Sequence, residues 1–288
     1  MYMRVYYDMT IARSQLVDVE VTPWYHVMSK TVRGAFLLAE GDCDRKQWIE
    51  NRLQELAGLF SIEVAGYAIL DNHLHVLVKL QPEIALEWSD EEAVRRWAKL
   101  YPPRDKNRKP LRETRAWVEQ KLADKDFVEQ CRDRLSSLSW FMKCLKEPLA
   151  RLANQQDSCK GAFWQARFKS IAILDDEALL ATCVYIDLNP LAAGIARLPE
   201  ESKHTSIRTR VDHCRAKGRL ADLQAARLGS VAGVKQAHGL ETGLWLCPIE
   251  DRRARGIKRA GMLEGFSLGS YLQLVDATSR LARRSKAR

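Results

Sequence analysis

Two histidines separated by one residue stand in the segment His73-Leu74-His75. In an extended strand, residues two apart point to the same face, so both imidazoles would project side by side. Imidazoles placed in this way suit the binding of one divalent metal ion. The same spacing also occurs by chance, so the pair alone leaves metal binding and a structural role both open.

A tyrosine on an expected helix is the second feature that could do chemistry. At 100° per residue, Tyr185 lies outside the apolar arc of its helix, beside small residues and with Asn189 one turn further on. This is the layout of a nucleophile, although a tyrosine ring that covers the edge of a sheet would fit as well. The arc that should face the core consists of Leu179, Leu180, Cys183, Val184, Ile186 and Leu188.

The elements that must position these residues follow the order β-α-β-β-α-β-α. Aromatic and β-branched runs predict strands, and apolar spacings of three and four predict helices. A carboxylate at Asp175 or Asp176 is a suitable cap for the tyrosine's helix, and Pro190 should end it. The order predicts an α+β fold of the ferredoxin-like type, an antiparallel sheet with helices on one face. The expected elements are strands at 24–30, 64–70, 73–80 and 163–173, and helices at 47–60, 138–152, 176–190 and 266–281.

Two further regions do not belong to that plan. Residues 81 to about 135 combine prolines and dense charge with short helical patterns, which predicts an insertion of helices and loops. Residues 211–288 form a basic C-terminal extension that could bind DNA or regulate the protein. We therefore expect one catalytic domain over residues 1–210, followed by this extension.

Composition and charge narrow the class of protein. The chain has 288 residues and 46% hydrophobic residues, enough for a sizeable core. Its net charge is +9, and residues 201–288 carry 18 Lys and Arg against 8 Asp and Glu. Such asymmetry favours a polyanion partner, though a solvated basic tail fits equally well. Seven cysteines without a C-x-x-C pair argue against a zinc knuckle. No segment resembles a membrane span or a secretory signal, so a cytoplasmic location is expected.

Three motifs in this order resemble the IS200-like single-tyrosine HUH transposases, and in particular the REP-associated tyrosine transposases. They are LDNHLHVLV at 70–78, FWQARFKS at 163–170 and YIDLNPLAAG at 185–194. The run YHVMSKTVR at 25–33 is similar to the first strand of that family. The resemblance extends from Trp24 to about Ile207.

The resemblance implies an enzyme that cuts and rejoins single-stranded DNA. It assigns His73 and His75 as ligands of Mg²⁺ or Mn²⁺, Tyr185 as the nucleophile that forms a 5′-phosphotyrosine, and Asn189 as the polar side chain that completes the metal site. Hairpin-forming repeats would be the substrate, and the protein would be a monomer or a homodimer. A DNA-hairpin-binding protein that no longer cuts, and a replication-initiator or relaxase-like nickase, remain alternatives.

This sequence departs from the pattern of that family at several positions. Asp71 stands where a proline or serine is common, and could be an outer partner of the metal site or a turn residue. Lys30, Gly34 and Ala192 stand where arginines are usual, which concerns the strength of DNA binding more than the cleavage chemistry.

Candidate DNA contacts come from two segments. Gln165, Arg167 and Lys169 would share one face of an extended strand and bind phosphates. A dense basic run in the extension could capture DNA, could fold back as an autoinhibitory tail, or could be a solvated loop. The run consists of Arg252, Arg253, Arg255, Lys258 and Arg259.

Overall fold

A four-stranded antiparallel sheet forms the centre of the protein. The computed structural model describes residues 16–39, 44–196, 198–227, 239–251 and 261–286. The strands are β1 (Trp24–Lys30), β2 (Ile62–Ile69), β3 (His73–Leu80) and β4 (Lys169–Ala172), in the spatial order β2-β3-β1-β4. The expected α+β class and the ferredoxin-like strand order are thus confirmed.

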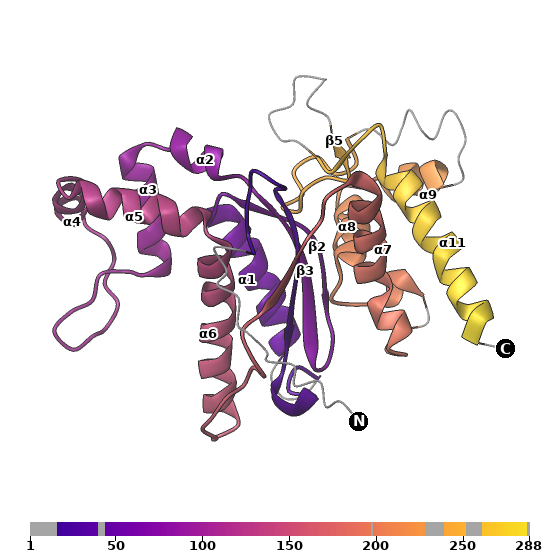
Figure 1. Cartoon of the computed structure of the whole chain (residues 1–288), viewed down its shortest axis with the longest axis horizontal. Helices are drawn as coiled ribbons and strands as arrows, with labels where there is room; N and C mark the ends of the chain where they lie inside the picture. The colour runs from indigo at the N-terminus through magenta and orange to yellow at the C-terminus, as the bar shows by residue number, and fades with distance from the viewer. Residues whose placement is uncertain (1–15, 40–43, 197, 228–238, 252–260, 287–288) are drawn as a thin grey trace, which may run out of the picture.

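One face of the sheet is covered by α1 (Arg45–Leu59) and α6 (Leu138–Gln156), as Figure 1 shows. The apolar stripe of α1, including Leu53 and Leu56, packs with Val76 and Val78 of β3 in one buried cluster. These two helices are the connections β1-α1-β2 and β3-α6-β4, so they form the helical layer that the sequence predicts.

The second face is also partly covered by helices. The expectation of helices on one face therefore holds for α1 and α6, but it does not describe the whole protein. Here α7 (Asp176–Ala192) and α8 (Ser206–Ala216) pack over β2 and β3. The reason is that this face carries apolar residues such as Ala68 and Leu77, which are buried with Ile186 and Ile207. The β1 and β4 half of this face is more open, since Lys169 and Ile171 are exposed there.

Four short helices lie between β3 and α6. They are α2 (Pro82–Glu87), α3 (Asp90–Leu100), α4 (Arg115–Leu122) and α5 (Lys125–Ser136). Ser89, Thr114 and Asp124 cap three of them, each accepting a hydrogen bond from the backbone N–H three residues on. A small cluster of Val94 and Val128 with Val118 fills the space between them.

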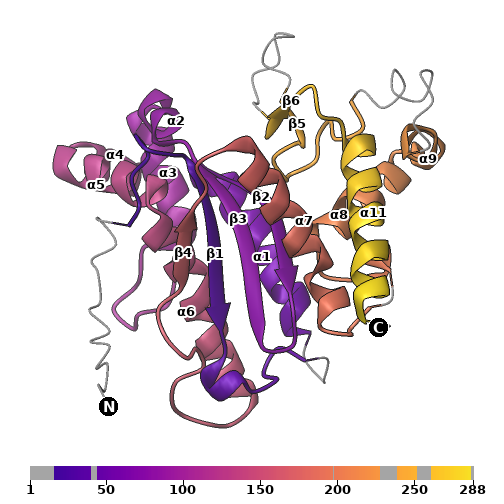
Figure 2. The ribbon, with the colours of Figure 1, turned by 45° about the vertical axis from the view of Figure 1, so that its right-hand side comes forward.

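The segment after α7 packs against α7 and α8. It contains η3 (Pro199–Glu201), α9 (Leu220–Arg227), the parallel pair β5 (Glu250–Asp251) and β6 (Leu263–Glu264), and α11 (Leu268–Lys286). Figure 2 shows α11 on the same side of the sheet as α7 and α8, and α11 is in contact with α7. Buried residues of α11, among them Tyr271 and Val275, share one cluster with Cys183 of α7. Among the described helices, none is long and apolar enough to cross a membrane.

Two boundaries differ from those that the sequence predicts. β4 begins only at Lys169, later than the expected start at residue 163. Phe163 and Phe168 are both buried, but in a continuous strand a spacing of five would place them on opposite faces. Residues 163–168 therefore turn instead of pairing as a strand. α7 passes through Pro190 and ends at Ala192. A proline in the last turn removes a single hydrogen bond, and the helix still closes with Ala193 N–H donating to the Asn189 carbonyl at 2.9 Å.

Candidate active site

β3 places His73 and His75 on the same face of the sheet, as the sequence predicts. The register pairs them with Lys30 and Met28 of β1. Their ring centres are 5.0 Å apart, with the rings nearly perpendicular. The half of the sheet that carries α7 therefore presents two imidazoles side by side.

A third histidine, His26 of β1, belongs to the same group, and sequence reasoning missed it. Its Nε2 lies 2.9 Å from Nδ1 of His75, and the two rings stack with centres 5.1 Å apart. A signal was present in the sequence: His26 and Lys30 alternate on one face of the first strand, and the ferredoxin-like order places that strand beside the third.

α7 brings the tyrosine to these histidines. Tyr185 is 53% exposed, and its ring centre lies 5.5 Å from that of His75 and 6.0 Å from that of His26. Asn189, one turn further, places Nδ2 at 3.4 Å from Nε2 of His75. The side chains at 73, 75, 185 and 189, which the sequence singled out, thus lie together.

The hydrogen bonds determine which ring nitrogens can accept a ligand. Nδ1 of His73 lies 2.6 Å from the carbonyl oxygen of the Asn72 side chain, an acceptor, so Nδ1 carries the proton and Nε2 has a free lone pair. If Nδ1 of His75 donates to His26, Nε2 of His75 keeps its lone pair, which faces the Asn189 side chain at 3.4 Å. Each candidate ligand is then oriented by a hydrogen bond from its other nitrogen, as is usual for histidines that bind metals.

Burial keeps these imidazoles neutral. Desolvation lowers the pKa of His26 to about 4. The pKa of His75 falls to about 3, first through desolvation and then through the neighbouring His26 and His73. For His73, desolvation and the charge of Lys30 lower the pKa, while the contact with Asn189 raises it. Neutral imidazole is the form that binds metal ions.

The donor set is compatible with a divalent metal ion, within limits. The ligands would be Nε2 of His73, Nε2 of His75 and, after rotation of its side-chain amide, the carboxamide oxygen of Asn189. No group of three or more His, Cys, Asp or Glu side chains arranged to hold a metal is found among the described residues. Such an ion would therefore depend on water or a substrate phosphate for its remaining ligands.

Asp71 does not serve as an outer partner of this group. Its Oδ1 accepts a hydrogen bond of 2.6 Å from Lys46 of α1, and α1 lies on the opposite face of the sheet from α7. Its backbone carbonyl accepts from the Leu38 N–H at 2.8 Å. The structure therefore supports the role of a turn residue.

The position of α7 over the histidines is determined by a buried carboxylate. Asp187 is 2% exposed and accepts hydrogen bonds from Ser206 Oγ at 2.7 Å, the Ile207 N–H at 3.0 Å and Tyr271 OH at 2.5 Å. Ser206 Oγ also accepts from the Tyr67 N–H of β2 at 3.1 Å. We call Asp187, Ser206 and Tyr271 the α7 clip, because they join the tyrosine's helix to β2, α8 and α11.

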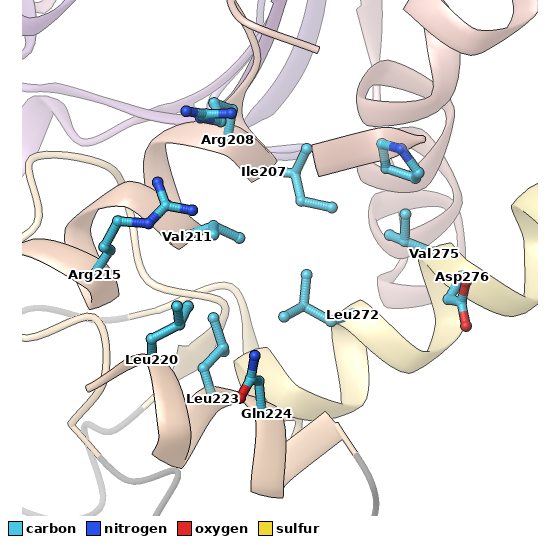
Figure 3. Close-up of a pocket in the computed structure, with 11 residues that line it drawn as sticks. Ile207, Arg208, Val211, Arg215, Leu220, Leu223, Gln224, Leu272, Val275 and Asp276 are labelled. Atoms are coloured by element: carbon cyan, nitrogen blue, oxygen red, sulfur yellow. The ribbon is translucent and has the colours of Figure 1, made fainter. Parts of the chain in front are cut away.

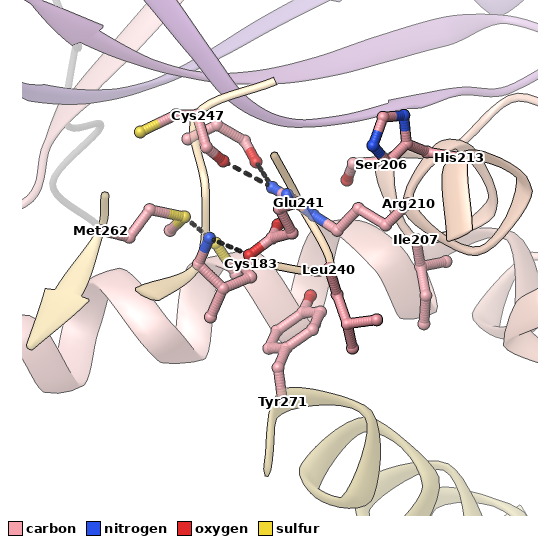
Figure 4. A network of polar contacts seen from close by, with 12 residues as sticks. Cys183, Ser206, Ile207, Arg210, His213, Leu240, Glu241, Cys247, Met262 and Tyr271 are labelled. Carbon is pink, nitrogen blue, oxygen red and sulfur yellow. Dashed lines mark hydrogen bonds and ion pairs between the residues drawn. The ribbon is translucent and has the colours of Figure 1, made fainter. Parts of the chain in front are cut away.

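Next to the clip, Arg210 connects α8 with the segment that follows it (Figure 4). Arg210 is fully buried and forms an ion pair with Glu241. Its Nη2 donates to the carbonyls of Ala65 at 2.6 Å and Cys247 at 3.0 Å. Sequence reasoning identified neither Asp187 nor Arg210, since a charged residue in a helix gives no sign of its burial.

The expected DNA contacts are only partly placed by the structure. Gln165, Arg167 and Lys169 are all exposed, but only Lys169 lies in β4, so the three do not share one strand face. The basic run Arg252, Arg253, Arg255, Lys258 and Arg259 lies outside the described residues.

A separate pocket of about 330 Å³ opens between α8, α9 and α11 (Figure 3). Its lining combines apolar side chains, among them Ile207, Leu223 and Leu272, with the charged side chains of Arg208 and Arg215. None of the histidines or Tyr185 lines it, so it is distinct from the tyrosine–histidine group.

Comparisons with known proteins add one structural likeness. No protein-family model matches the sequence. No curated protein matches it either. Among solved structures, the chain is similar to a REP-associated tyrosine transposase bound to a REP hairpin, with 13% sequence identity and a TM-score of 0.39. The match covers 66% of this chain and 78% of that one, and at this score it carries no argument about function.

Proposed function

We propose that the protein is a metal-dependent endonuclease and strand transferase that acts on single-stranded DNA at hairpin-forming repeats. The observation that carries the proposal is the exposed hydroxyl-bearing ring of Tyr185, which stands over neutral His75 and His26 with Asn189 one turn away. A tyrosine kept for packing would be buried, whereas this one is accessible to a substrate.

The reaction follows from these groups. The phenolic oxygen of Tyr185 attacks the phosphorus of the scissile phosphodiester, and a Tyr185 O–P bond forms while the P–O3′ bond breaks. The phenolic proton leaves to water, and the released strand ends in a 3′-OH. A second 3′-OH can then attack the 5′-phosphotyrosine and rejoin the DNA, because the covalent intermediate retains the energy of the ester bond.

The remaining side chains support this step. The metal ion, held by His73, His75 and Asn189, would supply Lewis-acid stabilisation of the charge on the phosphate oxygens. His26 orients His75, and the neutral state of all three imidazoles keeps the ligand positions free of competing protons. Lys30 and Lys169 are exposed beside the group on β1 and β4, where they can neutralise phosphates of the bound strand.

The substitution Tyr185→Phe tests the proposal. It removes the attacking oxygen and keeps the ring, so we expect nicking and the covalent adduct to disappear while the fold and hairpin affinity remain. The measurement is incubation with end-labelled hairpin DNA and Mn²⁺, followed by denaturing electrophoresis.

A second exposed tyrosine, Tyr101, provides the control, and Tyr101→Phe should leave the adduct unchanged. Adduct formation by Tyr185→Phe would refute the assignment. A wild-type protein that shifts the hairpin but never cuts it would support the alternative of a DNA-binding protein without catalysis.

A further inference from the structure

The connection between α3 and α4 forms a well-ordered turn rather than a loose loop. Asp105 Oδ1 accepts hydrogen bonds from the Asn107 N–H at 2.9 Å and the Lys109 N–H at 2.8 Å. The Asp105 N–H donates to the Lys109 carbonyl at 3.0 Å, and Leu111 N–H to the Pro103 carbonyl at 2.7 Å. Both views show this connection projecting from the body of the protein on the side of α6 (Figures 1 and 2).

This turn carries more basic than acidic side chains, and the described residues place no acidic partner in an ion pair with its cations. Its carboxylate, Asp105, is occupied by the backbone N–H groups of the turn itself. Five exposed basic residues follow the turn, and none of them forms an ion pair within the described part of the chain. They are Arg104, Lys106, Arg108, Lys109 and Arg112.

The base of the turn adjoins α6. Tyr101, at the end of α3, contacts Cys144 of α6 through its hydroxyl at 3.6 Å and meets the Trp140 ring edge-on at 6.1 Å. Lys143, which is exposed, places Nζ 4.3 Å from the centre of the Trp140 ring. A cation and a partly exposed aromatic ring therefore continue from the turn onto α6.

The same line of cations reaches the segment before β4. Lys146, one turn after Lys143 on α6, donates to the Ala166 carbonyl at 3.1 Å. Lys146 also lies over the Trp164 ring, whose Nε1 donates to the Lys146 carbonyl at 3.0 Å. Arg167 is exposed directly beyond Ala166.

From there the line ends at the histidines. The Gln165 N–H donates to the Lys30 carbonyl at 2.9 Å, and the register pairs Lys169 with Met28 and Lys30 with His73. Lys30 and Lys169 are both exposed. Successive contacts thus join the α3–α4 turn to the candidate active site around the β4 edge.

We propose that these residues form one surface, the α6 track, which binds the phosphate backbone of DNA that extends beyond the active site. The track consists of the five turn cations with Lys143, Lys146, Arg167, Lys169 and Lys30. Lysine and arginine at such positions bind phosphates without reading sequence, and the aromatic rings offer stacking surface. The inference rests on the proposed function for the identity of its ligand, and it assigns a role to the helices between β3 and α6.

The experiment measures DNA affinity against salt concentration. The turn variant replaces Lys106, Lys109 and Arg112 with Gln, which spares Asp105 and the backbone of the turn. The control variant has the same change of net charge but replaces exposed cations that are already in ion pairs: Arg115, Lys125 and Arg280. The probe is a fluorescent DNA hairpin with an unpaired flank, and nicking is prevented by EDTA.

Each lost phosphate contact should reduce the slope of log affinity against log salt by roughly 0.9 on duplex and 0.7 on single strands, or about two to three for the turn variant. The control should keep the wild-type slope. Probes in which only the stem or only the flank is lengthened identify the part of the DNA that binds the track. The difference in affinity between the wild type and the turn variant should grow only when that part is lengthened.

Two results would overturn the track: a wild-type slope in the turn variant, or an equal loss in the control. Because the assay needs no cleavage, it separates this inference from the proposed function. A protein that binds with the predicted slopes but never forms an adduct would refute the catalysis and keep the track.

Discussion

At the scale of single residues, the tyrosine–histidine group includes His26 as well as the residues that the sequence singled out. Nε2 of His26 lies 2.9 Å from Nδ1 of His75, whereas Asn189 lies beside the other ring nitrogen, Nε2. His26 can therefore determine which nitrogen of His75 is protonated, which makes it a positioning residue.

Replacing His26 with Ala should weaken Mn²⁺ binding by roughly 10- to 100-fold, because His75 loses the partner that orients it. The measurement is isothermal titration of the purified variant with Mn²⁺. His213→Ala is the matched control, since that histidine is partly exposed on α8 and its Nε2 lies 3.1 Å from the Thr242 carbonyl rather than beside His75. An unchanged Mn²⁺ affinity in His26→Ala would contradict this role.

The neutral histidines also predict how stability depends on pH. The folded pKa of His26 is about 4 and that of His75 about 3, against 6.5 for the free side chain. Between these pH values the unfolded chain binds more protons than the folded protein does. The contribution of the two histidines to the free energy of unfolding is therefore full above about pH 6.5 and is lost as the pH falls towards 4.

Urea unfolding in EDTA at several pH values between 7 and 4 measures this effect. The free energy of unfolding should decrease across the window in the wild type, and less steeply in a His26→Gln/His75→Gln variant. Equal pH dependence in both proteins would show that other groups are responsible.

At the scale of elements, the position of α7 relative to β3 determines whether the tyrosine reaches the histidines. The α7 clip attaches the helix only two residues from Tyr185 and two from Asn189, on the opposite side of the helix. Burial raises the pKa of the Asp187 carboxyl, and the hydrogen bonds from Tyr271 and Ser206 counteract that rise. Each donor therefore favours the ionised form of the Asp187 carboxyl.

Tyr271→Phe removes one of these donors, and we expect a loss of about 1.5–3 kcal/mol in the free energy of unfolding. Adduct formation should slow while hairpin affinity stays the same, because the helix loses its fixed position and the DNA contacts remain. The control is Tyr25→Phe, which removes a hydroxyl that donates to the Asp18 carbonyl at 2.9 Å, away from α7. Equal effects on adduct formation in both variants would indicate general destabilisation.

Much of this arrangement could be predicted from the sequence, because periodicity reports which face of an element is buried. The strand at 24–30, the hairpin that carries His73 and His75, and the separation of Tyr185 from the apolar arc all follow from spacing alone. The late start of β4 could not be predicted from spacing, because the burial of both Phe163 and Phe168 competes with strand pairing. The clip was also unpredictable, because its partners Asp187 and Tyr271 are 84 residues apart.

At the scale of the whole molecule, the segment after residue 210 shares a core with α7. Arg210 pairs with Glu241, and Tyr271 of α11 bonds to Asp187 of α7. Val275 and Cys247 are buried in the same cluster as Ile186. The sequence-based boundary at 210 falls within α8. The extension is therefore joined to residues 1–210 by packing and hydrogen bonds as well as by the chain itself.

A chain that ends at Arg210 should therefore fail to fold stably. It would lose Glu241, the ion-pair partner of Arg210, and expose the apolar residues of α7 that are buried with α11, so it loses hydrophobic burial as well as the ion pair. Circular dichroism and thermal unfolding of the truncated chain measure this. A truncated protein with a wild-type melting temperature would show that the two parts fold independently.

The α7 clip has a mechanical consequence for the proposed reaction. Once Tyr185 carries a DNA strand, α7 becomes a tethered anchor, and any tension on that strand pulls on a helix whose last turn already contains a proline. The hydrogen bonds of the α7 clip connect α7 to β2, α8 and α11, so these elements resist the force together with the end of α7. A protein that holds DNA covalently between two cuts needs this resistance to pulling as much as it needs a reactive oxygen.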